Sequence, residues 1–172
     1  MDNQETFLGN ESVVEIDETL IAKKRKYNRG RVVNQQWLFG AIERDGEMAF
    51  VKTVDRRDSA TLGRLIKEHI NESATVYSDE WAAYVKFFGE NLTYEHNTVN
   101  HSNYFVNTSN PVIHTQTIES FWGVLKRWIR TKNYSRREYL EYYLAEFLFR
   151  RFKKNLKEFE LFELIVKLIL DE

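Results

Sequence analysis

The chain has 172 residues, no cysteine and one proline, and its 25 Lys and Arg nearly balance its 26 Asp and Glu. This length fits one domain, or one domain with an appendage, and an aromatic content of 15 % supplies a core and excludes wholesale disorder. The lack of cysteine excludes disulfides, zinc ribbons and thiol nucleophiles. The apolar runs are short and interrupted by charge, and the N-terminus lacks the features of a signal peptide, so we expect an intracellular protein without membrane spans.

The first third of the chain predicts strands joined by a hairpin. Residues 13–18 are rich in β-branched side chains, which favours a strand, and residues 36–44 alternate between apolar and polar. The Asp-Gly pair at 45–46 is a strong hairpin signal, and 47–54 is expected as the returning strand. The basic segment 22–33 contains turn-forming residues and is expected to be a loop.

From residue 59 onward the patterns of helices and strands alternate. Ser59 can cap a helix running to about residue 70, and Gly89 can close a second helix over 80–88. The other expected elements are strands at 74–77 and 92–97, a polar loop at 100–111, and helices at 114–131, 135–153 and 157–170. This order indicates a mixed α/β domain with a C-terminal helical extension.

The near-zero net charge hides a strong asymmetry along the sequence. Residues 1–20 hold six acids and no base, whereas residues 23–31 hold six bases and no acid. Residues 121–157 hold eleven bases against three acids. Local basic density favours a polyanionic partner such as a nucleic acid, although for any one cluster an ordinary solvated helix face is the simpler interpretation.

Three acids occupy positions where a carboxylate is unusual. Asp17 lies in the first strand beside apolar neighbours, Asp79 follows a buried strand, and Glu119 lies in an otherwise apolar helix segment. An acid within a strand is costly unless it is paired or bound to a metal. Any one of them alone could be a surface acid, but together they could meet at one edge of the sheet and hold Mg²⁺ or Mn²⁺, which prefer hard oxygen ligands.

The helix that carries Glu119 also carries a basic stripe. Lys126 follows Glu119 by seven residues, so the two side chains lie on one helix face two turns apart, and Arg130 continues the stripe. A cation there could hold a phosphate near a metal-bound carboxylate, or the stripe could be an ordinary basic helix face.

Other catalytic chemistries find little support in the sequence. His69 is expected to be structural, and His96 and His101 have no cysteine or close third ligand that would favour zinc. The sequence shows no Ser-His-Asp arrangement and no glycine-rich phosphate loop. The carboxylates therefore remain the main candidates.

Six ordered motifs carry a resemblance to a known family. The sequence resembles the Merlin-type DDE transposases and their bacterial insertion-sequence relatives over roughly residues 11–151. The motifs occupy residues 14–19, 24–31, 36–40, 77–81, 99–102 and 114–122.

The resemblance implies an RNase H-like mixed sheet flanked by helices and cut-and-paste DNA transposition with two divalent ions, Mg²⁺ or Mn²⁺. The two aspartates of the family fall on Asp17 and Asp79, and its glutamate falls on Glu119, which makes these three the expected catalytic and metal-binding residues. The lysine that follows in the family falls on Lys126.

The expected partners are transposon-end and target DNA, and a homodimer or a larger assembly of the chain. The expected division is an N-terminal tail at 1–10, the catalytic domain at 11–151 and an amphipathic helix at 152–172. The location would be the nucleus in a eukaryotic host, and otherwise the cytoplasm or nucleoid. The residues expected to bind DNA are Lys24, Arg25, Lys26, Arg29, Arg31, His101, Lys126, Arg127 and Arg130.

Two other functions stay open at this point. One is a domesticated DNA-binding or scaffold protein that retains the three acids without transposition activity. The other, an RNase H-like ribonuclease, fits the fold but not the Trp-Gly-Val-Leu-Lys context of the late helix at 122–126. Family members usually carry an N-terminal region that recognises transposon ends, and about ten residues precede the first strand here, which points to a truncated copy, a domesticated domain or half of a split gene.

Overall fold

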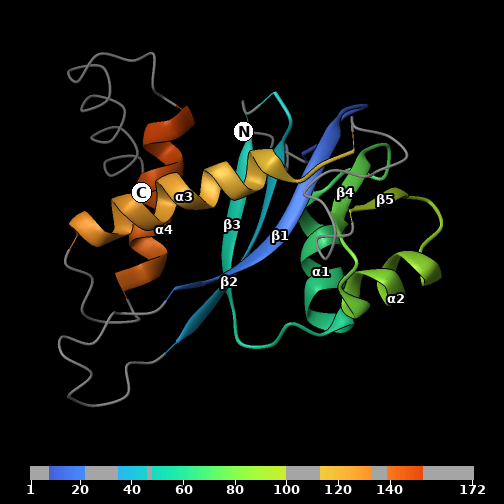
Figure 1. The fold of residues 1–172 in the computed structure, drawn as a ribbon, viewed down its shortest axis with the longest axis horizontal. Coiled ribbons are helices and arrows are strands. Elements are labelled where there is room, and N and C mark those ends of the chain that lie inside the picture. Colours follow the sequence, from blue (N-terminus) through green and yellow to red (C-terminus); the bar gives the residue numbers. More distant parts are fainter. Residues whose placement is uncertain (1–7, 22–34, 46–47, 100–112, 133–138, 153–172) are drawn as a thin grey trace, which may run out of the picture.

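A computed structural model of the chain describes residues 8–21, 35–45, 48–99, 113–132 and 139–152. These residues form a five-stranded mixed sheet covered by helices on both faces (Figure 1). The strands are β1 (Val13–Ile21), β2 (Gln36–Glu43), β3 (Ala49–Val54), β4 (Thr75–Asp79) and β5 (Glu95–Val99). The helices are α1 (Ser59–His69), α2 (Ala82–Glu90), α3 (Gln116–Thr131) and α4 (Leu140–Phe152).

Strand β1 lies at the centre of the sheet, whose order is β3-β2-β1-β4-β5. It pairs antiparallel with β2, and β2 pairs antiparallel with β3 through the hairpin that the Asp-Gly pair predicted. On its other side β1 pairs parallel with β4, and β4 pairs parallel with β5. Because parallel strands need a crossover connection, helices follow β3 and β4, and the carboxyl ends of β1, β4 and β5 point toward one edge.

The two faces of the sheet bury separate apolar clusters. Val14 and Ile16 of β1 pack with Leu62 of α1 and Phe87 of α2, while Ile21 packs with α3 and α4 on the opposite face. Side chains alternate along a strand, so Glu15 and Asp17 share the face of Ile21. In Figure 1, α3 crosses in front of the sheet over β1. This arrangement places the helix that carries Glu119 on the face where Asp17 points.

Several expected boundaries differ from the observed ones. Asp58, and not Ser59, caps α1, because its carboxylate accepts the Thr61 N–H at 2.8 Å. Asp79 is the last residue of β4 rather than a residue beyond it. Helix α2 starts two residues later than expected and includes Gly89, which the sequence suggested as its terminator. These differences arise from local hydrogen bonds that composition does not reveal.

The remaining elements follow the predicted order. Strand β5 starts at Glu95, later than expected, and α3 starts at Gln116. The described part of the helix predicted at 135–153 is α4, Leu140–Phe152. In the segment expected as a tail, Leu8 is buried against the core and its N–H donates to the His69 carbonyl at 2.9 Å. The predicted loops at 22–33 and 100–111 and the predicted helix at 157–170 lie outside the described residues. No helix in the described part of the chain is both long and apolar enough to span a bilayer.

Candidate active site

Two of the three candidate acids lie on neighbouring strands. Glu15 of β1 pairs with Tyr77 of β4, and continuing this parallel register by two residues brings Asp17 opposite Asp79. The pairing of β1 with β4 ends at Glu15 and Tyr77, so the two aspartates lie on neighbouring strands just beyond the last paired residues. The Asp79 carboxylate accepts the backbone N–H of Trp81 at 3.0 Å, which holds the chain in a turn as it leaves β4.

The third acid reaches the same face of the sheet through α3. The indole Nε1 of Trp122 donates to Oδ2 of Asp17 at 3.0 Å, so α3 lies directly on the face where Asp17 points. Glu119 lies three residues before Trp122 on this helix and therefore on a neighbouring part of its surface. Its carboxylate accepts the Thr115 hydroxyl at 3.3 Å. Glu119 is thus on the same side of the sheet as Asp17.

The three carboxylates do not form a closed ligand group as they stand. Among the described residues, no three His, Cys, Asp or Glu side chains are grouped closely enough to hold a metal ion. Each candidate acid instead accepts a hydrogen bond from a neighbour: Asp17 from Trp122, Asp79 from Trp81 and Glu119 from Thr115. Like-charged carboxylates repel one another, so each turns to the nearest donor. The approach of all three to a shared cation stays a prediction.

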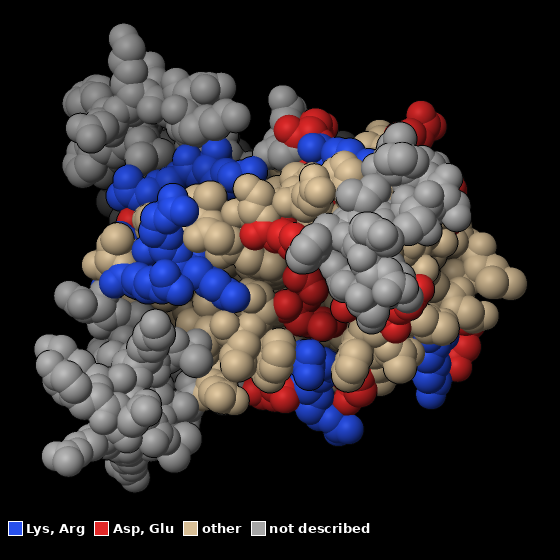
Figure 2. Space-filling view, viewed as in Figure 1, with Lys and Arg blue, Asp and Glu red and all other residues tan. Residues whose placement is uncertain are grey.

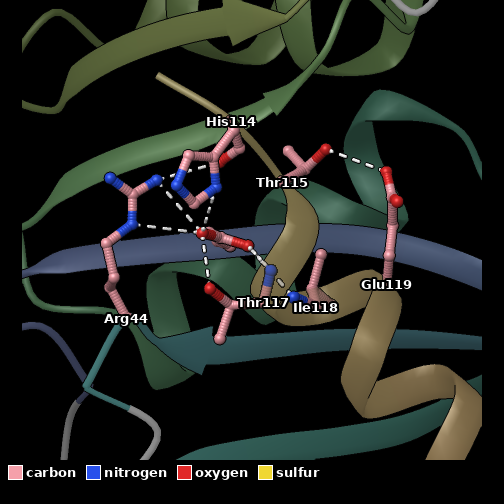
Figure 3. A network of polar contacts seen from close by, with 7 residues as sticks. Arg44, His114, Thr115, Thr117, Ile118 and Glu119 are labelled. Atoms are coloured by element: carbon pink, nitrogen blue, oxygen red, sulfur yellow. Dashed lines mark hydrogen bonds and ion pairs between the residues drawn. The ribbon is translucent and has the colours of Figure 1, made fainter. Parts of the chain in front are cut away.

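A buried carboxylate that the sequence did not single out ties α3 to β1. Glu15 is fully buried, and its Oε2 accepts the backbone N–H groups of Thr117 at 2.8 Å and Ile118 at 3.0 Å (Figure 3). Its Oε1 lies 3.1 Å from Arg44 Nη2 and 3.5 Å from His114 Nδ1. The carboxylate thereby caps the first turn of α3, whose free N–H groups and dipole favour an anion. Glu15 fixes the end of α3 that carries Glu119.

A glycine leaves room for the indole of Trp122 to pack against the sheet. Gly40 of β2 pairs with Asp17, and a Cβ at Gly40 would overlap the Trp122 indole, with Cζ2 at 2.7 Å and Cη2 closer still. Only the absence of a side chain at this position lets the ring lie flat enough to reach Asp17.

Gly40→Ala is therefore expected to displace the Trp122 ring and lower the free energy of unfolding by about 1–3 kcal/mol, the usual cost of overpacking. Urea unfolding measures this loss. Gly89→Ala is the matched control, because a Cβ there meets nothing within 4 Å and alanine stabilises a helix by about 0.5–1 kcal/mol. Equal stabilities for the two variants would contradict the account of Trp122.

Negative charge is crowded around the two aspartates. Glu18, next to Asp17 in β1, has a side chain only 5 % exposed. The pKa of its carboxyl is raised from the usual 4.5 to about 7, chiefly by burial. The Tyr84 hydroxyl and Arg57 lower this pKa, and the charges of Asp17 and Asp79 raise it. Glu18 is therefore a buried acid beside Asp17, partly compensated by Arg57.

This raised pKa predicts a pH-dependent stability. Between pH 4.5 and pH 7 the folded chain holds a proton on Glu18 that the unfolded chain has lost, so stability falls as pH rises through this window. Glu18→Gln, which mimics the protonated form, should raise the free energy of unfolding at pH 8 by up to about 3 kcal/mol and change it little at pH 4.5. Urea unfolding at both pH values tests this, with Glu68→Gln at an exposed helix position as control. A gain that does not depend on pH would contradict the assignment.

The donor chemistry of this edge fits a divalent cation. Asp17, Asp79 and Glu119 offer hard oxygen ligands, which suit Mg²⁺ or Mn²⁺. Asp17 and Asp79 are lesser causes of the raised pKa of Glu18, after burial, and a cation bound between these aspartates would offset their charge. The three acids fit a divalent cation in the type of ligand atom they offer and in the elements that carry them.

Basic side chains lie beside these acids on the same face of the molecule. Figure 2 shows acids gathered near the middle of this face and bases to the left, over the C-terminal half of α3 and over α4. Of the bases expected to contact DNA, Arg127 and Arg130 are exposed and Lys126 is half-buried. Lys132 instead pairs with Glu146 at 3.0 Å. The other candidates, Lys24, Arg25, Lys26, Arg29, Arg31 and His101, lie outside the described residues.

The described histidines have structural partners. His69 stacks on Phe50 with ring centroids 4.1 Å apart, as its helix position predicted. His96 stacks on Phe88 and lies 2.8 Å from the Ser78 hydroxyl, and burial lowers its pKa to about 4. It is therefore neutral at physiological pH, and no described histidine joins the carboxylates in a metal-binding group.

The five-stranded mixed sheet with helices on both faces is an RNase H-like fold. Residues 4–151 match the family model of ISXO2-like transposase domains. The chain belongs to this family, which confirms the resemblance drawn from its motifs.

Solved structures agree with this fold. The chain is similar to the HTLV-2 integrase catalytic core domain in complex with magnesium, with TM-scores of 0.51 to the dimeric form and 0.52 to the trimeric form and 13 % identity to each. The alignments cover 84 % of this chain and 87 % and 86 % of those chains. A simian T-cell lymphotropic virus intasome, in complex with a PP2A regulatory subunit, aligns at TM-score 0.50 and 16 % identity, covering 81 % of this chain and 49 % of that one. A comparison with curated proteins finds no match.

Proposed function

We propose that the chain is the catalytic domain of a DDE transposase that cleaves DNA strands and transfers them in cut-and-paste transposition. One observation carries this proposal. Asp17 and Asp79 lie on adjacent parallel strands, and the helix bearing Glu119 is hydrogen-bonded to Asp17 through Trp122. Membership of a transposase family and the RNase H-like fold support the same activity.

Each group of side chains has its own role in the proposed reaction. Asp17, Asp79 and Glu119 would hold divalent ions, of which the family resemblance implies two. When bound, such ions activate the attacking oxygen and stabilise the charge on the leaving oxygen. Trp122 orients the Asp17 carboxylate, and Glu15 holds the end of α3 that presents Glu119. The bases Lys126, Arg127 and Arg130 would bind DNA phosphates beside the acids.

The proposed partners are transposon-end and target DNA and further copies of this chain. The related integrase cores are described in dimeric and trimeric forms, which supports an assembly. We propose residues 11–151 as the catalytic domain and 152–172 as an amphipathic helix beside it.

A nicking assay on supercoiled plasmid tests the activity. The chain should convert supercoiled DNA to the open form with Mg²⁺ or Mn²⁺ and not with EDTA. DNA binding without cleavage under every divalent ion would overturn the proposal in favour of a domesticated DNA-binding protein.

Lys126 provides a test of the DNA-binding surface. It lies seven residues beyond Glu119, about 10 Å along the helix, which is too far for a bond to that carboxylate but suits a phosphate beside it. Lys126→Ala should weaken binding to all DNA sequences and reduce the salt slope of binding by roughly one unit.

The control for this variant is Lys86→Ala, which removes an exposed base from α2. Lys132 is unsuitable, because its ion pair with Glu146 adds a structural effect. Equal, small effects from Lys126→Ala and Lys86→Ala in a fluorescence anisotropy titration would show that Lys126 is an ordinary solvated base.

A further inference from the structure

An exposed tryptophan lies next to one of the candidate acids. Trp81 follows β4 directly, and its backbone N–H donates to the Asp79 carboxylate at 3.0 Å. Its side chain is 40 % exposed, whereas aromatic side chains such as Tyr84 and Phe87 on the following helix are buried. The exposed part of this ring is available for contact with a ligand near Asp79.

The ring is held in place from behind. The indole Nε1 of Trp81 donates to the Arg57 carbonyl at 3.2 Å. The Arg57 guanidinium lies over the Trp37 ring at 3.7 Å from its centroid and over the Trp81 ring at 5.0 Å. The guanidinium also lies 3.8 Å from the Glu18 carboxylate. The stack of Trp37, Arg57 and Trp81 therefore fixes an exposed indole and brings a cation to the acidic edge.

The stack of Trp37, Arg57 and Trp81 lies close to the candidate acids. The Arg57 guanidinium lies 3.8 Å from the Glu18 carboxylate, and Glu18 is the neighbour of Asp17 in β1. The turn that follows β4 brings Trp81 close to Asp79, because the two residues are linked by a hydrogen bond within this turn. A DNA strand with a phosphate at Asp79 would bring an adjacent nucleotide to the Trp81 indole.

We propose that Trp81, backed by Arg57 and Trp37, is a stacking platform for an unpaired DNA base next to the phosphate at the candidate active site. This inference rests on the proposed function in taking DNA as the ligand. An indole can stack only on a base whose face is free, so the platform binds a single-stranded nucleotide and not a base inside a duplex. The fixed ring loses little conformational freedom on binding, which favours the contact.

The experiment compares two DNA duplexes in a buffer containing Ca²⁺, which takes oxygen ligands and lets a DNA phosphate approach the acids. A gel of each sample verifies that no strand is cut during the measurement. One carries a short single-stranded adenine overhang, and the other carries the same overhang with abasic sites, which keeps the phosphates and removes the bases. The wild-type chain should bind the adenine overhang roughly 5- to 100-fold more tightly than the abasic one, the range that base–aromatic stacking supplies. Trp81→Ala should abolish this preference while leaving abasic affinity and the salt slope unchanged.

Three variants make the comparison specific. Trp81→Phe keeps an aromatic face and should retain most of the preference for the adenine overhang. Trp81→Leu keeps an apolar side chain against Arg57 but has no aromatic face, so it should lose this preference. Trp81→Leu also serves as the test if Trp81→Ala does not fold. Tyr142→Ala, which removes an aromatic ring 73 % exposed on α4, should keep the full preference.

Three results would overturn the inference: no preference in the wild-type chain, a preference that survives in Trp81→Leu, or an equal loss of affinity for both duplexes. A separate nicking assay with Mg²⁺ keeps the two proposals apart. Cleavage without a Trp81-dependent preference would refute the platform alone, and a Trp81-dependent preference without cleavage would refute the proposed function alone.

Discussion

Asp79→Asn is expected to reduce divalent-ion-dependent DNA cleavage by about 10³-fold, while DNA affinity measured in EDTA stays within about twofold. The substitution removes an anionic ligand from the carboxyl end of β4, and losing metal stabilisation of the reacting oxygens forfeits about 4 kcal/mol of the transition-state interaction. Plasmid nicking and fluorescence anisotropy measure the two quantities. Asp17→Asn and Glu119→Gln are expected to behave in the same way.

Glu80→Gln is the matched control for this prediction. It changes the adjacent acid, which is exposed beyond the end of β4, and should leave cleavage within a few-fold of the wild-type rate. If Glu80→Gln and Asp79→Asn lost activity equally, the local charge and not a particular ligand would explain the effect. If Asp79→Asn remained fully active, Asp79 would have no role in catalysis.

Glu15→Ala is expected to lower the free energy of unfolding by about 3–5 kcal/mol. Its removal leaves Arg44 without its buried partner and leaves the Thr117 and Ile118 N–H groups at the start of α3 without an acceptor. Glu15→Gln should recover only part of the lost stability. Its side-chain NH₂ group is a donor and would face the N–H donors that the carboxylate accepts from. Chemical denaturation measures both variants.

Glu95→Ala controls for the loss of an acid from the sheet. Glu95 is exposed on β5 and bonds the Thr75 hydroxyl at 3.0 Å, so its removal should cost no more than about 1 kcal/mol. A Glu15→Ala protein as stable as Glu95→Ala would show that α3 is held by its apolar face alone. A destabilised variant would support Glu15 as the anchor that positions Glu119.

Local patterns predicted the architecture of the chain well. The Asp-Gly hairpin, the alternation in β2 and the apolar periodicity of α3 each depend on neighbouring residues, and the mixed sheet with a helical C-terminal part is confirmed. Asp17 and Glu119 stood out because each lies among apolar residues, and Asp79 stood out because it follows a buried strand. Their placement on one face of the sheet follows from the topology, while their catalytic role stays a prediction.

The features that hold the site together could not be predicted from local patterns. Glu15 bonds residues 102 and 103 positions away, and Trp122 bonds Asp17 across 105 positions. Gly40 looked like an ordinary strand residue, although its lack of a side chain makes room for that indole. Such requirements come from packing between distant segments. An acid at position 15, two residues before Asp17 on the same strand face, was the one available signal.

The central claim is that Asp17, Asp79 and Glu119 share divalent ions, and anomalous scattering from crystals of the chain soaked in Mn²⁺ tests it most directly. The account predicts anomalous peaks within about 2 Å of carboxylate oxygens of Asp17 and Asp79, with Glu119 turned from Thr115 toward the metal. Asp79→Asn crystals soaked in the same way should show a weakened or absent peak. Well-ordered wild-type crystals with no anomalous peak at these carboxylates in saturating Mn²⁺ would contradict the account.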